Sequence, residues 1–488
     1  MIESTARTLR VVASAGSGKT QTIVERIAHQ IRGGLDPCRL LVLTFDAGAA
    51  RSLRERLAAR VGGAGGPPVA TLNAFAYRLL RRWVPREHRP IAPRQVRENL
   101  LQGVIEALGR KSALHRSALV TGERSYEGLF SLFKNALFDP RAPTEPTLAG
   151  FILESSHAAP FLPMTRDRAL LERSVQALIW LFTAHEHAMG QNGWMDFDDQ
   201  KLRAWVALRG NGGLRQRVER RYSEVIVDEF QDINRLDFEL IRIIARRSRL
   251  LLAGDDDQAI YGFRGCTPDF ILDPQGHLKR AVASYELQTN YRNAPNLMRQ
   301  AERLISHNRR RIPKHPVPHR RDKATITVHE AASPEAEAGM VVADIERQLG
   351  ENPALRPRDV AVLYRMHVQS LPLRAALCAA AIPYTVQDRG DFPGDETAGD
   401  LGDEGGLRNG VELLTCFKAK GLQWDTVFLI GCNAGLIPHP RAPVEEERRL
   451  FYVAMTRAIA HLRISYIAPF DTGEGAPSPF LAEAGLVK

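Results

Sequence analysis

The stretch ASAGSGKT, residues 13–20, decides the fold that the sequence predicts. It matches the phosphate-binding loop pattern G-x-x-x-x-G-K-[ST], except that Ala13 takes the place of the first glycine. Glycines let a backbone turn its N–H groups toward phosphate oxygens. Lys19 is placed to reach the β/γ-phosphates, and the hydroxyl of Thr20 is placed to hold Mg²⁺. We therefore expect a nucleotide site built from the whole loop: Ala13, Ser14, Ala15, Gly16, Ser17, Gly18, Lys19 and Thr20.

The segments on either side of the loop support this interpretation. TLRVV (8–12) is typical of a short buried strand, and TQTIVERIAHQI (20–31) is typical of a helix with isoleucines on one face. A helix that begins at the loop adds a favourable dipole for phosphate. A plain strand–helix turn is the alternative, but strand, loop, Lys-Thr pair and helix all agree with a phosphate site.

A second motif, EVIVDEFQDIN (224–234), fits the first. It is an apolar strand that ends in paired acids. Asp228 at the strand tip is placed to hold Mg²⁺ through water, and Glu229 is placed to orient and deprotonate an attacking water. Alone, such a run is as often a strand that leaves the core. Beside a Lys-Thr loop, it favours nucleotide hydrolysis.

Length and composition are those of an ordinary soluble globular protein with about two to four domains: 488 residues, 44% apolar and 25% charged. No apolar run approaches the ~18 residues of a membrane span, and the N-terminal residues lack an apolar stretch. The five cysteines form no CxxC pair, which indicates no zinc site and suits a reducing cytoplasm. We expect a cytoplasmic protein without a membrane partner. Its net charge of +10 weakly favours a polyanionic partner.

Several continuous apolar runs punctuate the chain, as is typical of buried parallel strands. They are LLVLTF (40–45), EVIVD (224–228), LLLAG (250–254), DVAVLYR (359–365), TVFLIG (426–431) and LRISY (462–466). They fall into two sets separated near residue 275, so we expect an α/β fold with two parallel-sheet cores. Residues 81–194 instead show helical spacing and few strand-like runs, which predicts a mainly helical insertion in the first core.

Together with DEFQD (228–232), a series of segments resembles the motifs of the UvrD/Rep/PcrA-like superfamily 1A DNA helicases. The segments are LTFDAGAARSLRERL (43–57), TLNAF (71–75), MDFDD (195–199), LLAGDDDQAIYGFRG (251–265), LQTNYRN (287–293), NRRRIPK (308–314), VAVLYRMHVQS (360–370), LLTCFKAKGLQWDTVFLIG (413–431) and EEERRLFYVAMTRA (445–458). They occur in the family's order along nearly the whole chain. Any one match could arise by chance, whereas the ordered set is very specific.

The resemblance implies two RecA-like P-loop domains with ATP and Mg²⁺ between them. The first domain would contribute Lys19, Thr20, Asp228, Glu229 and Gln258. The second would contribute Arg292 and Arg457, because phosphoryl transfer needs positive charge where the γ-phosphate leaves. A surface ion pair is the alternative for each arginine. Binding of ATP would close the two domains, and hydrolysis would release them.

The resemblance implies roles for further residues around the nucleotide. Tyr291 would stack on the adenine. Gln423 replaces the family's ribose-binding glutamate, and its amide can still accept one hydrogen bond from a hydroxyl. Gln231 would link the nucleotide state to the second domain.

The resemblance also implies a track for single-stranded DNA, where aromatic faces stack on bases and polar groups bind phosphates. Its residues would be Phe45, Thr71, Asn73, Tyr261, Phe263, Arg264 and Arg365. Phe263 replaces a tryptophan, and Asn73 replaces a histidine. A core position is the alternative for Phe45, and structural ion pairs are the alternatives for Arg264 and Arg365.

The sequence departs from the family pattern in several places. Few residues precede the first strand, so either the upstream glutamine element that recognises adenine is missing or the natural start lies elsewhere. Ala47 and Gly48 replace an Asn-Lys pair, and Phe417 replaces a histidine. The basic stretch 307–323 fits a phosphate-facing path or a solvated loop, and we favour the loop. Residues 390–407 are glycine-rich and acidic, so we expect a flexible loop in place of a 2B-like subdomain.

These observations predict the domain boundaries. Residues 1–80 and 195–275 would form the ATP-binding domain 1A, 81–194 the helical insertion 1B, 276–389 and 408–488 domain 2A, and 390–407 the loop in place of 2B.

Three functions remain open at this point. The leading hypothesis is an ATP-driven translocase on single-stranded DNA that unwinds tailed duplexes as a helicase, with 3′–5′ polarity implied by the resemblance alone. The second is a DNA-stimulated ATPase that unwinds only with a partner, such as a nuclease or repair complex. The third is an ATP-inert scaffold that binds DNA, which the intact Lys19, Asp228, Glu229, Arg292 and Arg457 disfavour.

Overall fold

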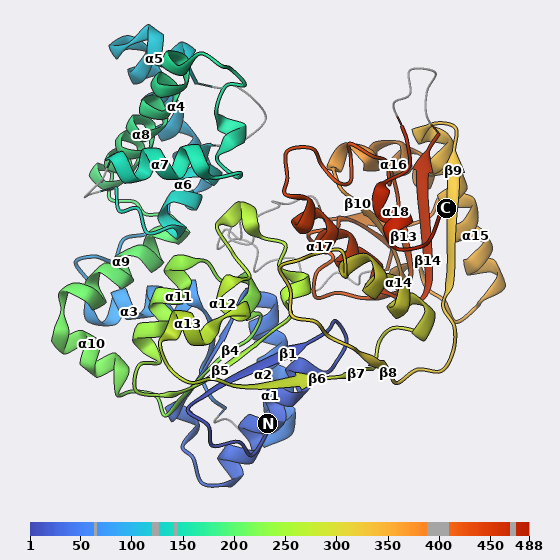
Figure 1. Ribbon diagram of the computed structural model, residues 1–488, viewed down its shortest axis with the longest axis horizontal. Coiled ribbons are helices and arrows are strands. Elements are labelled where there is room, and N and C mark those ends of the chain that lie inside the picture. The colour runs from blue at the N-terminus through green and yellow to red at the C-terminus, as the bar shows by residue number, and fades with distance from the viewer. Residues whose placement is uncertain (63–65, 120–125, 141–144, 388–408, 469–474, 488) are drawn as a thin grey trace. The chain divides into compact units, whose positions relative to one another are not determined.

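A computed structural model describes residues 1–62, 66–119, 126–140, 145–387, 409–468 and 475–487 (Figure 1). The chain divides into two compact units. The first consists of Met1–Val12, Thr20–Gly254 and Tyr261–Tyr285, and the second of Ala13–Lys19, Asp255–Ile260 and Glu286–Lys488. Two short loops from the N-terminal half therefore group with the C-terminal half. The loop predicted over 390–407 lies outside the described residues.

A parallel sheet forms the core of the first unit. Its order is β3-β2-β4-β5-β1-β6, and the strands from β3 to β1 pair in parallel. Their bounds are β1 (Thr8–Ala13), β2 (Leu40–Thr44), β3 (Val69–Thr71), β4 (Glu224–Val227), β5 (Arg249–Gly254) and β6 (Ala283–Leu287). Every residue of β2 and β4 is buried, which explains why these strands are apolar runs without polar alternation.

The carboxyl ends of these parallel strands meet at one edge of the sheet. There β1 leads into Ser14, β2 into Phe45, β4 into Asp228 and β5 into Asp255. Ligands of open α/β sheets bind outside the carboxyl ends of the strands. The predicted nucleotide and DNA residues of these segments therefore leave the sheet at the edge where such folds bind ligands.

Helices form around this sheet where the sequence provides caps and apolar faces. Their bounds are α1 (Lys19–Arg32), α2 (Ala47–Val61), α3 (Leu72–Trp83), α9 (Phe197–Gly210), α10 (Gly212–Glu219), α11 (Arg235–Ile244), α12 (Asp269–Leu272) and α13 (Pro274–Leu278). The side chains of Asp46 and Thr71 cap α2 and α3, and Asn234 forms a capping box with Asp237 at α11. These caps satisfy backbone N–H groups that a helix start leaves without partners.

The stretch between α3 and α9 is helical, as predicted. Its helices are α4 (Arg94–Lys111), α5 (Ala113–Ser117), α6 (Tyr126–Asn135), α7 (Glu145–Glu154) and α8 (Arg168–Gln191). They gather into one group (Figure 1) around a core of their own that includes Phe130, Phe133 and Phe182. The predicted helical insertion of the α/β fold is confirmed.

A buried ion cluster joins this insertion to the start of α9. The ammonium group of Lys134 on α6 lies 2.8 Å from Glu186 on α8 and 2.7 and 3.0 Å from Asp196 and Asp199. Burial opposes the charge of Lys134, but the carboxylates hold its pKa well above the usual value. One lysine thus compensates carboxylates from two different parts of the first unit.

A second parallel sheet forms the core of the second unit. Its order is β11-β12-β10-β13-β14-β9, with all neighbours parallel. Its strands are β9 (Thr325–Ala331), β10 (Val360–Tyr364), β11 (Tyr384–Val386), β12 (Val411–Thr415), β13 (Trp424–Leu429) and β14 (Ala458–Ile467). The helices are α14 (Pro295–Ile305), α15 (Pro334–Glu351), α16 (Ser370–Ala379), α17 (Val444–Met455) and α18 (Pro479–Glu483). Two parallel-sheet cores confirm the predicted fold class.

The second unit also contains smaller features near the glycine loop. The short strands β7 (Thr289–Asn290) and β8 (Val317–Pro318) pair in parallel. A 3₁₀ turn, Asp256–Gln258, follows β5. Across the described ranges, no helix combines the length and apolarity needed to cross a membrane.

Candidate nucleotide and DNA-binding site

The loop after β1 has the backbone that a phosphate-binding loop requires. Gly16 and Gly18 both have a φ of 78°, in the left-handed region that glycine adopts without steric cost. Ser17 donates to the carbonyl of Ser14 from its backbone N–H at 3.2 Å and from its hydroxyl at 2.8 Å, which closes the turn. Lys19 is the first residue of α1. The segment is therefore a tight turn that ends at a helix N-terminus, an arrangement suited to anions.

The acids that follow β4 lie in an unusual backbone conformation. Glu229 has φ of 54° and ψ of 43°, a left-handed conformation that costs a non-glycine residue roughly 1–3 kcal/mol. The Asp228 carboxylate accepts the N–H of Glu229 at 3.0 Å. Gln231 Nε2 donates to Glu229 Oε2 at 2.5 Å and to Asp232 at 3.2 Å. Gln231 thus contacts the carboxylate that the sequence predicts as the general base.

The second unit brings Tyr291 and Arg292 onto the glycine loop. Asn290 Nδ2 donates to the carbonyl of Ala15 at 2.7 Å, and the N–H of Tyr291 donates to the carbonyl of Gly16 at 2.9 Å. A Cβ atom added to Gly16 would lie 2.6 Å from the Cβ of Arg292. Only glycine permits this approach. Tyr291 remains 57% exposed, so a planar ligand can reach it.

Arg457 meets Gln258 in the same unit. Arg457 Nη2 donates to Gln258 Oε1 at 3.3 Å, and its Nε donates to the carbonyl of Val453 at 2.8 Å. Lys420 Nζ donates to the Gln258 carbonyl at 2.6 Å. Gln423, predicted to contact ribose, is exposed close to this group in the sequence. Of the predicted nucleotide residues, the second unit thus joins Gln258 with Arg457 and Gly16 with Arg292.

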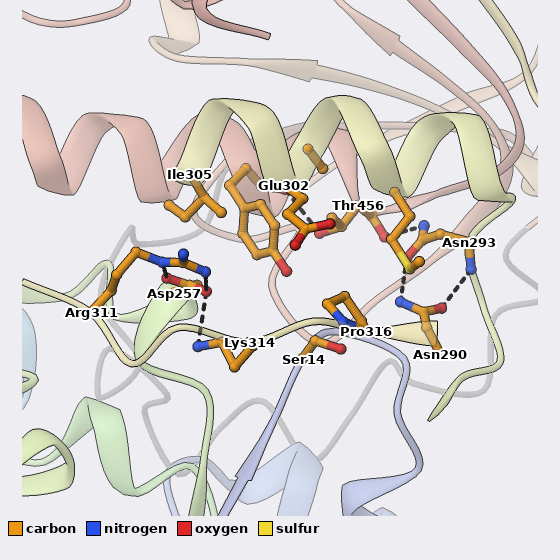
Figure 2. Close-up of a pocket in the computed structure, with 13 residues that line it drawn as sticks. Ser14, Asp257, Asn290, Asn293, Glu302, Ile305, Arg311, Lys314, Pro316 and Thr456 are labelled. Atoms are coloured by element: carbon orange, nitrogen blue, oxygen red, sulfur yellow. Dashed lines mark hydrogen bonds and ion pairs between the residues drawn. The ribbon is translucent and has the colours of Figure 1, made fainter. Parts of the chain in front are cut away.

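Three consecutive aspartates beside Gln258 are buried and bound by two cations. Lys314 Nζ lies 3.0, 2.5 and 2.8 Å from carboxylate oxygens of Asp255, Asp256 and Asp257. Arg311 donates to both oxygens of Asp257, at 2.9 and 2.8 Å, and Figure 2 shows both cations directed at this residue. Burial opposes ionisation of Asp257, but Lys314 and Arg311 hold its pKa below the usual value.

Figure 2 also shows a small pocket bordered by these groups and by α14. Ser14 of the glycine loop lies at its edge, opposite Glu302 and Asn293. Ser14 Oγ is buried without a hydrogen-bond partner among the described residues. A buried polar atom beside a pocket of this kind is a place for a bound water.

All three aromatic residues predicted to contact DNA form one cluster in the first unit. The rings of Phe45 and Tyr261 stack at 4.9 Å with an interplanar angle of 15°, and Phe263 packs edge-on to Tyr261 at 6.1 Å. The guanidinium of Arg264 lies 5.9 Å from the Phe45 ring centre. Tyr261 is buried, and burial raises its pKa, whereas Phe45 and Phe263 are half-buried. Aromatic rings that keep some exposed surface are the kind of group that stacks on bases.

The other predicted DNA residues are Thr71 and Asn73 in the first unit and Arg365 in the second. The Thr71 hydroxyl accepts the N–H of Ala74 at 3.1 Å as the cap of α3, and Asn73 is half-buried two residues later. Arg365 belongs to the second unit, where it donates to the buried carboxylate of Glu447 at 2.9 Å. It also lies 5.0 Å from the ring of Phe417. Its contacts are those of the structural ion pair that was the alternative.

Comparison with family models covers both units. Residues 1–279 match the UvrD/REP helicase N-terminal domain. Residues 285–393 and 399–469 match the UvrD-like helicase C-terminal domain. The first match alone exceeds half of the 488 residues. This chain belongs to the UvrD/REP helicase family. Its two parallel sheets are accordingly the RecA-like cores of a UvrD-like helicase, as predicted.

Several curated proteins are similar to this UvrD/REP family member. The ATP-dependent DNA helicase PcrA of Leuconostoc citreum is 29% identical over 393 residues, 79% of this chain and 48% of PcrA. The ATP-dependent DNA helicase UvrD2 of Mycobacterium tuberculosis is 28% identical, covering 96% of this chain and 78% of UvrD2. DNA helicase II of Escherichia coli is 28% identical, covering 78% of this chain and 49% of DNA helicase II. The chain spans about half the length of the PcrA and DNA helicase II relatives.

The helicase motifs predicted single residues but missed their partners. Asn290, Lys314, Arg311 and Lys420 were not assigned roles, yet each contacts the glycine loop or the Gln258 turn. The N-x-x-R-x-x-K spacing of residues 308–314 was the available signal. It marked Arg311 and Lys314 without indicating what they bind.

Proposed function

We propose that this protein is an ATP-dependent translocase on single-stranded DNA and a 3′–5′ DNA helicase that acts on tailed duplexes. ATP would bind at residues 13–20 and would be hydrolysed in the cleft between the two RecA-like domains. The family membership and relatives named as ATP-dependent DNA helicases support the activity. The polarity is carried over from the family resemblance.

The residues of the first unit fit a nucleotide that arrives with Mg²⁺. The hydroxyl of Thr20 and the carboxylate of Asp228 are oxygen donors, and Mg²⁺ in such sites takes one or two protein oxygens together with phosphates and waters. In the described part of the chain, no group of three or more His, Cys, Asp or Glu side chains could hold a metal ion alone. Mg²⁺ would offset phosphate charge, Lys19 would bind the β/γ-phosphates, and Glu229 would accept a proton from the attacking water.

One observation carries the proposal. Within the second unit, Arg292 lies so close to Gly16 that a Cβ atom on this glycine would lie 2.6 Å from the Cβ of Arg292. Tyr291 is bonded to the same glycine and keeps an exposed ring. A cation and a stacking ring beside a glycine loop support catalysis by an arginine finger and adenine binding.

A second candidate is the DNA-stimulated ATPase that unwinds only with a partner, such as a nuclease or repair complex. Arg365 supports it, because this predicted DNA contact is bound to Glu447 and packs against Phe417. The DNA track of the translocase would then have fewer side chains that contact DNA. A third candidate, the ATP-inert scaffold, requires that the glycine loop have no catalytic use.

The ATPase test uses phosphate release with and without single-stranded DNA. We expect DNA to stimulate hydrolysis and Lys19→Ala to abolish it, because Lys19 would be the cation nearest the transferred phosphate. Lys111→Ala removes an exposed lysine from α4 and serves as the control with normal rates. Equal rates for Lys19→Ala and the unchanged protein would support the inert scaffold instead.

The unwinding test uses duplexes with a 3′ or a 5′ single-stranded tail. The proposal expects strand displacement from 3′ tails only, and only with hydrolysable ATP. Unwinding from 5′ tails alone would refute the polarity. ATPase activity without strand displacement from either tail would favour the partner-dependent motor.

A further inference from the structure

The basic stretch 307–323 has no role in the proposal above, yet one of its lysines is buried and forms ion pairs with three aspartates. Lys314 is 3% exposed and contacts Asp255, Asp256 and Asp257, each of which is at most 1% exposed. The N–H of Ile312 donates to Asp256 at 2.7 Å. Three neighbouring buried carboxylates need such partners, because an uncompensated buried charge is strongly destabilising.

The same contacts reach the Gln258 side chain. Asp255 uses one oxygen for Lys314 at 3.0 Å and the other for Gln258 Nε2 at 2.6 Å. With its amide nitrogen held by Asp255, Gln258 presents Oε1 to Arg457 Nη2 at 3.3 Å. Lys314 thus acts on the orientation of the Gln258 amide through one carboxylate.

The far end of the stretch contacts β7 and the residues Tyr291 and Arg292 that follow it. The N–H of His319 donates to the carbonyl of Asn290 at 2.8 Å, and the His319 ring packs on the Tyr291 ring at 5.0 Å. Arg320 Nη1 donates to the carbonyl of Arg292 at 3.3 Å. A single segment, residues 311–320, therefore contacts both the turn that holds Gln258 and the pair Tyr291 and Arg292.

We propose that residues 311–320 position these two elements: Lys314 orients Gln258 through Asp255, and His319 supports Tyr291 as it stacks on the nucleotide base. Neither residue touches the reacting atoms, so both are positioning residues. The inference deepens the proposed function and rests on it. It also gives the basic stretch a purpose other than a DNA phosphate path or a solvated loop.

The test separates the two ends of the segment by steady-state kinetics of DNA-stimulated ATP hydrolysis. For Lys314→Met we expect kcat to fall roughly tenfold or more with KM for ATP little changed, since small misplacement of a catalytic group can cost up to ~10² in rate. For His319→Ala we expect KM for ATP to rise several-fold with kcat nearly unchanged, because the loss affects base binding in ground and transition states alike. His319 is exposed, so its removal leaves the core intact.

A double-mutant cycle shows whether Lys314 works through Gln258. Once Gln258→Ala has removed the amide, Lys314→Met should lower kcat little further, whereas independent defects would multiply. Arg299→Met is the matched control, because it removes an exposed cation from α14 in the same unit. It should leave kcat and KM unchanged.

The outcomes distinguish this inference from the proposed function. If the unchanged protein hydrolyses no ATP with DNA present, the proposed function fails before any variant is compared. If it hydrolyses ATP but Lys314→Met and His319→Ala behave like Arg299→Met, the positioning role is overturned. Multiplicative effects of Lys314→Met and Gln258→Ala would overturn it as well. Should Lys314→Met not fold, as judged by circular dichroism, the KM of His319→Ala decides: a normal KM overturns the inference.

Discussion

Glu229 is the residue at which backbone strain and expected chemistry coincide. It is the second residue after β4, and Gln231 and Asp228 both form hydrogen bonds with it. Local bonding over-determines the conformation, which is the condition under which such strain persists. The strained conformation of Glu229 is therefore better explained by a chemical role than by a contribution to stability.

Replacement of Glu229 tests this interpretation. We expect Glu229→Gln to bind ATP and DNA normally but to lower turnover by roughly 10²–10⁴-fold, since an amide cannot accept the proton of the attacking water. Phosphate release measures turnover, and a fluorescent ATP analogue measures binding. Glu55→Gln changes an exposed glutamate on α2 in the same unit and should be normal. Normal turnover of Glu229→Gln would remove the general-base assignment.

Gly16 permits a second prediction, because the chain supplies a matched glycine. Gly16 and Gly34 have φ of 78° and 88°, but only Gly16 has a neighbour against which a Cβ would collide. We expect both alanine variants to lose about 1–2 kcal/mol of unfolding free energy from the left-handed backbone. Only Gly16→Ala should also weaken ATP binding, as measured by titration with the fluorescent analogue. Equal ATP affinities would show that the contact with Arg292 is unimportant.

At the scale of elements, α1 is tied to β4 by a fully buried ion pair. Arg26 on α1 donates to the two oxygens of Glu224 at 2.7 and 3.2 Å, and both side chains are completely buried. Gln30 adds a third bond to Glu224 at 2.6 Å. This pair holds the helix that begins at Lys19 against the strand that ends before Asp228.

The same helix region offers an exposed pair for comparison. Arg60 on α2 bonds Glu25 on α1 at 2.8 Å, with side chains 45% and 27% exposed. We expect Arg26→Met to lower the unfolding free energy by about 3–5 kcal/mol, because it removes the buried partner of Glu224 and leaves only Arg249, which is 36% exposed, at 3.1 Å. Arg60→Met should lower it far less, because solvent screens an exposed ion pair. Urea denaturation measures both values, and similar losses would contradict the distinction.

The strands also show which elements of the fold could be predicted from the sequence and which could not. β2, β4, β5, β10 and β13 were predictable because buried parallel strands are continuous apolar runs. β6 and β9 were not, because most of their residues are exposed or half-buried and they contain no such run. β7 and β8, of two residues each, are too short for any periodicity.

The residues of the candidate site also divide into those that the sequence predicts and those that it does not. Local patterns predicted the glycine loop and the acids after β4, because each motif lies within a few consecutive residues. The bonds of Lys314 to Asp256 and of Arg311 to Asp257 join residues 58 and 54 positions apart. No spacing rule on a single sequence indicates such a pairing, so the cluster was found only from the structure.

At the scale of the whole molecule, the buried cysteines report on the integrity of the second core. Cys416 and Cys432 are buried, and burial raises the pKa of Cys416 to about 12 and that of Cys432 well above its usual value. Cys38 and Cys378 are exposed. The thiolate, not the thiol, is the reactive form.

Alkylation of the native protein should therefore be selective. At pH 8 we expect iodoacetamide to modify Cys38 and Cys378, while Cys416, with only about 10⁻⁴ of its thiol ionised, reacts on unfolding. Peptide mass spectrometry with and without urea measures the order of modification. Early labelling of Cys416 in the native protein would show that the second sheet opens readily.

The lysine buried between α6, α8 and the start of α9 has a consequence for engineering. Glu186 travels with the insertion, but Asp196 and Asp199 remain with the host domain. A chimera that exchanges the insertion for a foreign module packed on the same site would leave these two acids, 21% and 6% exposed here, without their lysine partner. Such a chimera needs a replacement module with a cation at the position of Lys134. Otherwise, Asp196 and Asp199 of the host domain must first be replaced by asparagine.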